Sequence, residues 1–236
     1  AETPADGPIP DAVLERLARR NGIAPWTGIG ALYGDRRVVA AAKRVIKECL
    51  RPFASRLVFV TPWKARMART VLERLPGLRK SRMAFLAGRV DETLRHFSGR
   101  PSEIALPLAY WKSGGPPQGR RMDPARDGCG LLWYAPLVPM VPERVRTYVD
   151  FVRKTCLEFG LDPLITLTSL SDRCFDSTVP ILFDRSNPAD AQRAHACFDA
   201  LLERGQREGF LPYRLGVQSM KKLTHAPLSS VELSAK

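Results

Sequence analysis

The adjacent phenol and guanidinium of Tyr213 and Arg214 are the side chains in this sequence best suited to chemistry on a negatively charged oxygen. They lie in an apolar stretch that we predict to be a strand over residues 210–215. A tyrosine hydroxyl and an arginine can stabilise an oxyanion in a dry pocket. The alternative is structural: a tyrosine packed in a core and an arginine that reaches solvent. Alternation along an ideal strand would put the two on opposite faces, so they need not serve one oxygen.

A second polar pattern predicts the wall of a site. Residues 164–168 alternate like a half-buried strand, with Thr166 and Thr168 on one face and Ile165 and Leu167 on the other. We expect the helices of this half to cover only one face of the sheet. The face that carries the two threonines would then be the wall of a site that another domain completes.

The elements that must position these residues follow a β-α-β-β-α-β order from residue 131 onward. We predict strands over 131–135, 164–168, 178–183 and 210–215. Pro142 opens the first helix and Gly160 stops it, whereas Asn187 caps a second helix that Pro188 begins. The core stripe of that second helix comprises Ala194, Cys197, Phe198, Leu201 and Leu202.

The first half reads as a looser version of the same unit. Strands are predicted over 28–33, 57–61 and 104–110, and helices over 38–50, from Pro62 and over 89–97. The expected fold class is therefore α+β, with two ferredoxin-like halves sharing one large antiparallel sheet that has helices on one face. Residues 1–25 would be a linker and N-terminal helix, 26–112 the first half, 113–130 a mobile Gly/Pro/Arg-rich linker, 131–215 the second half and 216–236 a tail.

Composition excludes several classes of protein. The chain has 236 residues, 44% of them hydrophobic, and no apolar run that could span a membrane. Its five cysteines form no C-x-x-C pair, and Cys49, Cys156 and Cys197 are expected in the core. The three histidines form no constellation with a nucleophile, and no metal site is predicted. A net charge of +13 is open to nucleic-acid binding, but the arginines form no single block, so a solvated surface is favoured.

Three segments resemble one enzyme family. The runs Glu208-Gly209-Phe210-Leu211-Pro212-Tyr213-Arg214, Leu131-Leu132-Trp133-Tyr134-Ala135-Pro136 and Ala31-Leu32-Tyr33-Gly34 are similar, in order and spacing, to the substrate (cap) domain of the vanillyl-alcohol oxidase / p-cresol methylhydroxylase family of FAD-linked oxidases. The resemblance extends from about Trp26 to about His225. It implies hydride transfer from a 4-alkyl or 4-allyl phenol to FAD, with the same two-half architecture.

The resemblance also implies residue roles. Tyr213 would donate to the substrate oxygen, and Arg214 would place positive charge near the substrate or flavin. Trp133, Thr166, Thr168 and Asp176 would line the substrate pocket. Tyr110 and Trp111 would contact the cofactor, since some members attach their flavin through a tyrosine beside such a tryptophan; the alternative for Tyr110 is a packed strand aromatic.

The chain also departs from the family pattern. An ungapped match would put Ala109 at the flavin-linking position, and Leu132 stands where other members have a linking histidine, so non-covalent FAD is expected. Thr166 replaces an acidic residue of some members. Asp176 ends a segment that replaces a histidine motif, where it could substitute for a polar contact or cap a turn.

The expected partners follow from the same resemblance. They are the FAD-binding domain of a longer parent chain, a phenolic substrate, a cytochrome or other electron acceptor, and further copies of the parent; no membrane or nucleic acid is expected. The isolated chain should be inactive because the family's Pro-Gly-Arg segment, which follows the last strand, is absent. A cytoplasmic or periplasmic location is compatible. The alternatives are a stand-alone basic ferredoxin-like module, which would bind nucleic acid or protein, and a degenerate assembly domain.

Overall fold

The computed structural model describes residues 7–75, 77 and 81–222, and those residues form two compact units. Unit 1 joins Ala1–Gly22 to Leu106–Lys236, and unit 2 is Ile23–Ala105. The stretch 113–130, which was expected as a linker between halves, lies inside unit 1. Among the described residues, no helix is long and apolar enough to cross a membrane.

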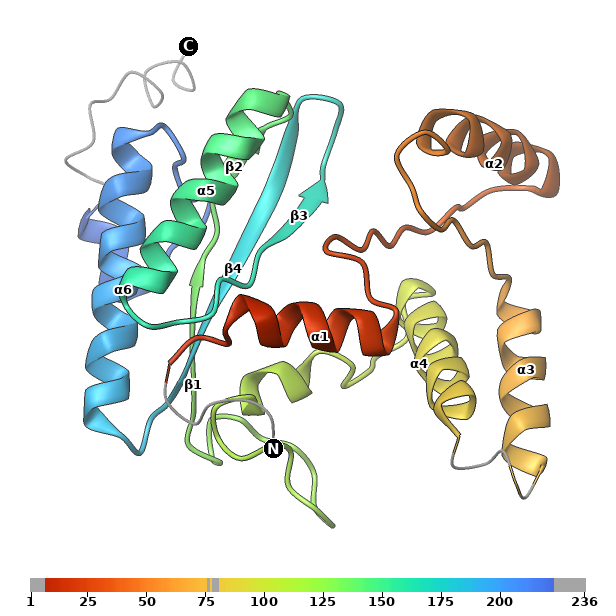
Figure 1. Cartoon of the computed structure of the whole chain (residues 1–236), viewed down its shortest axis with the longest axis horizontal. Helices are drawn as coiled ribbons and strands as arrows, with labels where there is room; N and C mark the ends of the chain where they lie inside the picture. The colour runs from red at the N-terminus through yellow and green to blue at the C-terminus, as the bar shows by residue number, and fades with distance from the viewer. Residues whose placement is uncertain (1–6, 76, 78–80, 223–236) are drawn as a thin grey trace. The chain divides into compact units, whose positions relative to one another are not determined.

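Unit 1 is built on an antiparallel sheet (Figure 1). Strands β1 (Cys129–Tyr134) and β2 (Leu137–Pro139) pair with β4 (Cys174–Asp184) in one unbroken register, because Tyr134 faces Val179 and Leu137 faces Asp176. The segment 129–139 therefore acts as one long strand. Strand β3 (Thr166–Ser169) pairs with the same part of β4 as β2 does, so it lies along the other edge.

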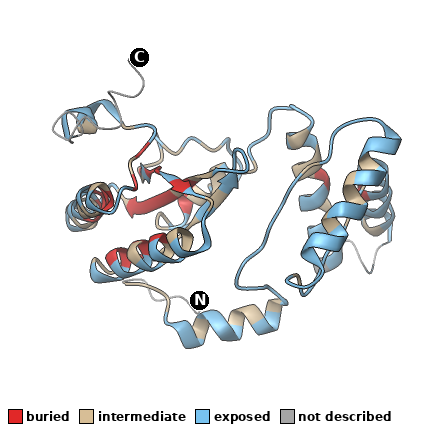
Figure 2. Cartoon of the chain, turned by 90° about the horizontal axis from the view of Figure 1, so that it is seen from above, coloured by how far each residue is buried: buried red, intermediate tan, exposed pale blue. Residues whose placement is uncertain are grey.

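Two helices cover one face of this sheet: α5 (Pro142–Glu158) and α6 (Pro188–Arg207). Pro142 and Pro188 stand in the first turns as predicted, and the Asn187 side chain accepts hydrogen bonds from two backbone amides of α6. All five predicted core residues of α6 are buried: Ala194, Cys197, Phe198, Leu201 and Leu202. Figure 2 shows the buried residues gathered on the strands and on the helix sides that face them.

The last predicted strand is much shorter than expected. Over 210–215 the structure has a single bridge, Pro136 with Pro212, flanked by backbone hydrogen bonds from Leu137 N to Leu211 O and from Tyr213 N to Ala135 O. Proline has no amide hydrogen to donate, and both central residues of this pairing are prolines, so the ladder cannot extend. The short pairing still fixes residues 211–213 beside the long strand.

Unit 1 also contains α1 (Asp11–Asn21), η1 (Leu106–Tyr110) and η2 (Val217–Lys222). The predicted strand over 104–110 is wrong, since residues 106–110 form the 3-10 helix η1. Pro107 lies inside that segment and lacks the amide hydrogen that a strand ladder needs.

Unit 2 consists of helices: α2 (Arg36–Leu50), α3 (Pro62–Arg74) and α4 (Arg82–Phe97), of which α3 and α4 pack together. The predicted strands over 28–33 and 57–61 are wrong, because neither segment forms a strand. Two ferredoxin-like halves on one sheet are therefore not found; the fold is an antiparallel sheet with helices, plus a helical unit. Cys49, expected in the core, is exposed on α2.

Candidate functional site

The sheet face turned away from α5 and α6, here called the open face, carries four of the residues predicted from sequence. Side chains directly opposite in an antiparallel pair share a face. Thr168 faces Asp176, and Thr166 lies two residues along β3; Trp133 pairs with Pro180, four residues along β4 from Asp176. The opposite face is occupied by the alternate positions of the same strands. Tyr134, Val138 and Ser177 are at such positions and point into the helical core, where they are buried. The period-two pattern thus gathers Trp133, Thr166, Thr168 and Asp176 on one face.

Tyr213 reaches this face and contacts one of the four. Its hydroxyl donates to Oδ2 of Asp176 at 3.1 Å, while its side chain remains 44% exposed and so accessible to a ligand. Desolvation raises the pKa of the Tyr213 hydroxyl, and the hydrogen bond and charge of Asp176 raise it further. Oδ1 of Asp176 is buried and accepts no hydrogen bond from any described residue. A buried acceptor of this kind is costly unless a ligand or water supplies a donor.

A buried aromatic anchor holds the segment that carries Tyr213. Phe210 is fully buried, with its ring 5.1 Å from that of Tyr148 and stacked at 6.1 Å on Phe151. Its carbonyl accepts the hydroxyl proton of buried Tyr134 at 2.8 Å. Burial raises the pKa of Tyr134 far above its ordinary value, so this donor keeps its proton. The position of Tyr213 is therefore determined by core packing three residues earlier.

A second hydrogen-bond chain connects the helical core to the strands of the open face. Ser177 donates to the carbonyl of Thr166 at 3.0 Å, so the 2.7 Å contact between Tyr148 and Ser177 has Tyr148 as its donor. The bond from Ser177 to Thr166 joins β4 to β3. Ser177 lies between Asp176 and Thr178 in β4, so the bond also holds these open-face neighbours in place against β3. Sequence reasoning missed Tyr148 and Ser177 as supports, because the strand was predicted to begin at residue 178, whereas β4 begins at Cys174.

Arg214 lies beside the same phenol. Its guanidinium carbon is 5.3 Å from the centroid of the Tyr213 ring, an arrangement that favours a cation–π attraction. No carboxylate among the described residues forms an ion pair with it. The two side chains therefore lie together, in contrast to the opposite faces that an ideal strand would give, because the pairing ends before Arg214.

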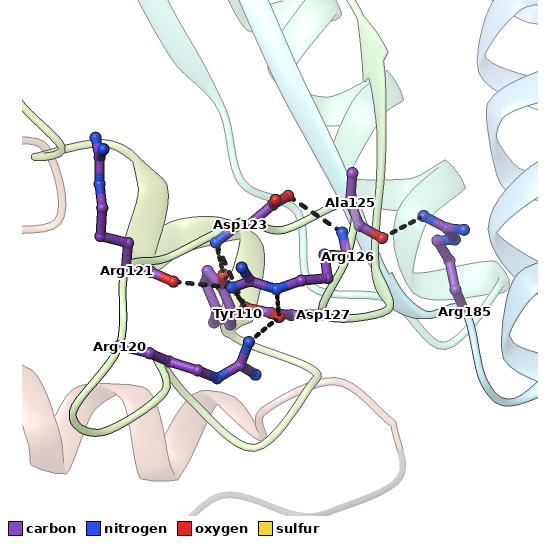
Figure 3. Close-up of polar contacts among 8 residues, drawn as sticks. All are labelled: Tyr110, Arg120, Arg121, Asp123, Ala125, Arg126, Asp127 and Arg185. Atoms are coloured by element: carbon purple, nitrogen blue, oxygen red, sulfur yellow. Dashed lines mark hydrogen bonds and ion pairs between the residues drawn. The ribbon is translucent and has the colours of Figure 1, made fainter.

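Tyr110 is placed differently from the other predicted residues. It is 2% exposed, and its hydroxyl donates to Oδ2 of Asp127 at 2.7 Å while accepting from the amide of Asp123 (Figure 3). Arg120 and Arg126 donate to the other oxygen of Asp127 at 2.6 and 2.9 Å. Arg126 first and then Tyr110 hold the pKa of Asp127 well below its ordinary value. These bonds tie together the 113–130 stretch that the sequence predicted to be mobile.

Trp111 lies close to the end of the sheet. It lines a small cavity at the edge of the sheet, together with Pro180 and Leu182 and with core residues such as Cys156, Leu161 and Ile181. Pro180 and Leu182 belong to the open-face side of β4 by register. Trp111 is 48% exposed, so its ring can offer a flat surface to a planar group, as the sequence prediction for a cofactor contact requires. Among the described residues, no group of His, Cys, Asp or Glu has the arrangement of a metal site.

Comparisons with known proteins identify relatives of this chain. A scan of family models gives no match. In sequence the chain is 36% identical over 226 residues to the 1'-carboxy-chondrochloren decarboxylase of Chondromyces crocatus, covering 94% of this chain and 41% of that protein. It is 21% identical over 224 residues to the 4-cresol dehydrogenase [hydroxylating] flavoprotein subunit of Pseudomonas putida, covering 95% and 36%. The chain is a relative of the vanillyl-alcohol oxidase / p-cresol methylhydroxylase family.

Solved structures of that family have the same fold over this region. The structure of p-cresol methylhydroxylase with substrate bound matches with a TM-score of 0.71 and 20% identity, covering 100% of this chain and 39% of that one. The 4-ethylphenol oxidase of Gulosibacter chungangensis in an isoeugenol complex matches with a TM-score of 0.69 and 18% identity, covering 97% and 38%. The chain thus spans about two fifths of the length of these family members. The alternative of a stand-alone basic module is not favoured.

Proposed function

We propose that this chain is the substrate-binding (cap) part of an FAD-dependent oxidoreductase that oxidises para-substituted phenols by hydride transfer to flavin. The observation that carries the proposal is the pairing of Tyr213 with Asp176 on the open face, in a chain related to a flavoprotein that is named for 4-cresol. A phenol and a carboxylate with one unused, buried oxygen suit a substrate that presents a hydroxyl group.

The polar and charged residues of the open face suit a substrate that carries a hydroxyl group, such as a phenol. A free phenol titrates near ~10, so at neutral pH the substrate arrives protonated, and its oxygen becomes negatively charged only as that proton leaves. Arg214 supplies positive charge, and the Tyr213 hydroxyl can hydrogen-bond the substrate oxygen. Trp133, Thr166 and Thr168 form the wall beside them.

FAD, held mainly by a part of the protein outside this chain and without a covalent link, supplies the hydride acceptor. Trp111 is our candidate contact for the isoalloxazine ring, since its exposed indole lies beside the open-face residues of β4. Tyr110 supports Trp111 through its hydrogen bond to Asp127. An electron acceptor such as a cytochrome and association of several copies are further proposals, motivated by the relative named as a flavoprotein subunit.

Anaerobic mixing tests this function. The full-length gene product, loaded with FAD, should lose its oxidised flavin absorbance when mixed with 4-ethylphenol. Deuterium at the benzylic carbon should slow that loss, because the carbon–hydrogen bond breaks in the step. The outcome that refutes the proposal is a flavin that 4-alkylphenols leave oxidised while another class of substrate reduces it.

A second candidate reaction is oxidative decarboxylation, which the relative named as a decarboxylase favours. Loss of a benzylic hydride from a 4-(2-carboxyethyl)phenol gives a quinone methide. The electron pair of the carbon–carboxylate bond then flows into that acceptor, which releases CO₂ and leaves a 4-vinylphenol.

Product analysis separates the two reactions. With 3-(4-hydroxyphenyl)propanoate, an oxidative decarboxylase forms CO₂ and 4-vinylphenol in equal amounts. A simple dehydrogenase or hydroxylase keeps the carboxylate on its product. Finding all of the carboxylate retained would exclude the second reaction and leave the first in place.

A further inference from the structure

We propose that Asp176 is a catalytic residue: its Oδ1 accepts the phenol proton as the hydride leaves the benzylic carbon. This inference rests on the proposed function and deepens it. It concerns a residue at which the chain departs from the family pattern, because Asp176 ends the segment that replaces a histidine motif.

The geometry around Asp176 supports this role. Oδ2 is held by the Tyr213 hydroxyl at 3.1 Å, which fixes the orientation of the carboxylate. Oδ1 is buried and has no donor among the described residues. A substrate hydroxyl would donate its single proton to Oδ1, while the Tyr213 hydroxyl continues to donate to Oδ2.

The surroundings leave Asp176 as the acceptor. In register, Leu137 of β2 and Thr168 of β3 flank it, and neither is titratable. The segment after α6 contributes Tyr213 and the cation Arg214. From the helical side, Tyr148 interacts with its charge, but burial raises the pKa of that phenol far above its ordinary value. On the same side of β4, the titratable groups are Cys174, two residues away, and Asp184, at the far end of the strand.

A carboxylate is basic enough for this step. A phenol in water is a weak acid, but its acidity rises steeply as the hydride leaves, because the ring becomes a protonated quinone methide. The oxygen–hydrogen bond breaks and its proton goes to Oδ1, while the benzylic carbon–hydrogen pair goes to the oxidised flavin as hydride. The substrate loses one proton and one hydride and becomes a neutral quinone methide. General-base assistance of this kind contributes typically ~10²- to 10⁴-fold in rate.

The pH dependence of flavin reduction tests the role in the full-length, FAD-loaded protein. With 4-ethylphenol, Asp176→Asn should reduce the rate at neutral pH by about 10²- to 10⁴-fold. The rate of this variant should then rise with pH toward the phenol pKa near ~10, since a phenolate needs no base. Asp176→Glu, which keeps a carboxylate, should recover part of the neutral activity. Asp172→Asn, an exposed aspartate in the β3–β4 loop, is the matched control and should behave as wild type.

A binding measurement gives a readout that does not depend on turnover. A carboxylate beside a phenol favours its neutral form and raises its pKa. Bound 4-nitrophenol should therefore ionise at lower pH in Asp176→Asn than in wild type, as followed by its yellow phenolate band. An unchanged bound pKa together with an unchanged pH profile would overturn the assignment, even if the wild type oxidises phenols. A wild type that 4-ethylphenol does not reduce would instead overturn the proposed function, and the base role with it.

Discussion

At the scale of single residues, the proposed site depends on the Tyr213 side chain, whose position is set by residues elsewhere in the chain. Tyr213 is exposed, but the buried Phe210 ring and the Tyr134 hydroxyl hold its segment in place. The sequence predicted Tyr213 and Asp176 separately, 37 residues apart, and did not predict that they touch. That contact follows from the register of β2 on β4 and from the bridge at Pro212, which no local pattern specifies.

Tyr213→Phe removes the hydroxyl and keeps the ring. The change deletes one hydrogen bond to a charged oxygen, worth about 1.5–3 kcal/mol. Flavin reduction by a 4-alkylphenol in the full-length protein should slow roughly 10- to 150-fold, since about 1.36 kcal/mol corresponds to a factor of ten. The melting temperature should barely change, because the side chain is 44% exposed. A large loss of stability with an unchanged rate would mean that the hydroxyl is only structural.

At the scale of elements, sequence patterns succeeded where one face of a helix or strand is buried. The three-and-four spacing of α6 predicted its buried stripe, because the core of unit 1 selects those positions. The same reasoning failed over 28–33 and 57–61, where apolar residues occur without a partner strand. A strand needs a neighbour as well as a propensity, and a single sequence does not say where that neighbour is.

The contact between α6 and β1 leaves no room for a side chain at Gly205. A Cβ there would lie 2.0 Å from the Tyr134 hydroxyl and 3.1 Å from the carbonyl of Phe210. Gly205→Ala should therefore lower the free energy of unfolding of unit 1 by about 1–3 kcal/mol, the usual cost of overpacking. Gly88→Ala is the control, since a Cβ at that position of α4 meets nothing within 4 Å. Urea denaturation followed by circular dichroism measures both; equal effects would contradict the proposed close contact.

The Asp127 network should make the 110–129 loop sensitive to acid. The pKa of Asp127 is lower in the folded protein, so its stabilising contribution is fully present above the unfolded pKa of about 4. It is lost as the pH falls from there through the folded pKa. Asp127→Asn should shift the amide resonances of residues 110–129 at neutral pH. Asp123→Asn keeps the hydrogen bond from the backbone amide of residue 123 to the Tyr110 hydroxyl, so it should shift these resonances less. Equal shifts would argue against a network centred on Asp127.

At the scale of the whole molecule, the two units differ in charge and in core. Residues 23–105 hold 17 Lys and Arg against six Asp and Glu, so unit 2 carries +11 of the net charge of +13. Among its described residues, the buried ones are Ala65, Ala84 and Asp91, and none has a large apolar side chain. The sequence alone did not indicate this difference in charge between the units, because arginines occur throughout the chain and the charge of each unit can be counted only when its boundaries are known.

This difference predicts unequal local stability in the isolated chain. Hydrogen exchange should be slow for amides of β4, α5 and α6, which enclose the core, and fast for α2, α3 and α4. Raising the salt concentration should slow exchange in unit 2 more than in unit 1, since salt screens like-charge repulsion. Equal protection of both units would contradict the assignment of the core to unit 1.

The most direct test of the account is a crystal structure of the full-length, FAD-loaded protein with a 4-alkylphenol bound. We predict that the phenol oxygen lies on the open face, within hydrogen-bond distance of Oδ1 of Asp176 and of the Tyr213 hydroxyl. The benzylic carbon should point away from these two residues, toward the flavin. A phenol bound anywhere else, with Tyr213 and Asp176 paired and uncontacted, would contradict the central claim.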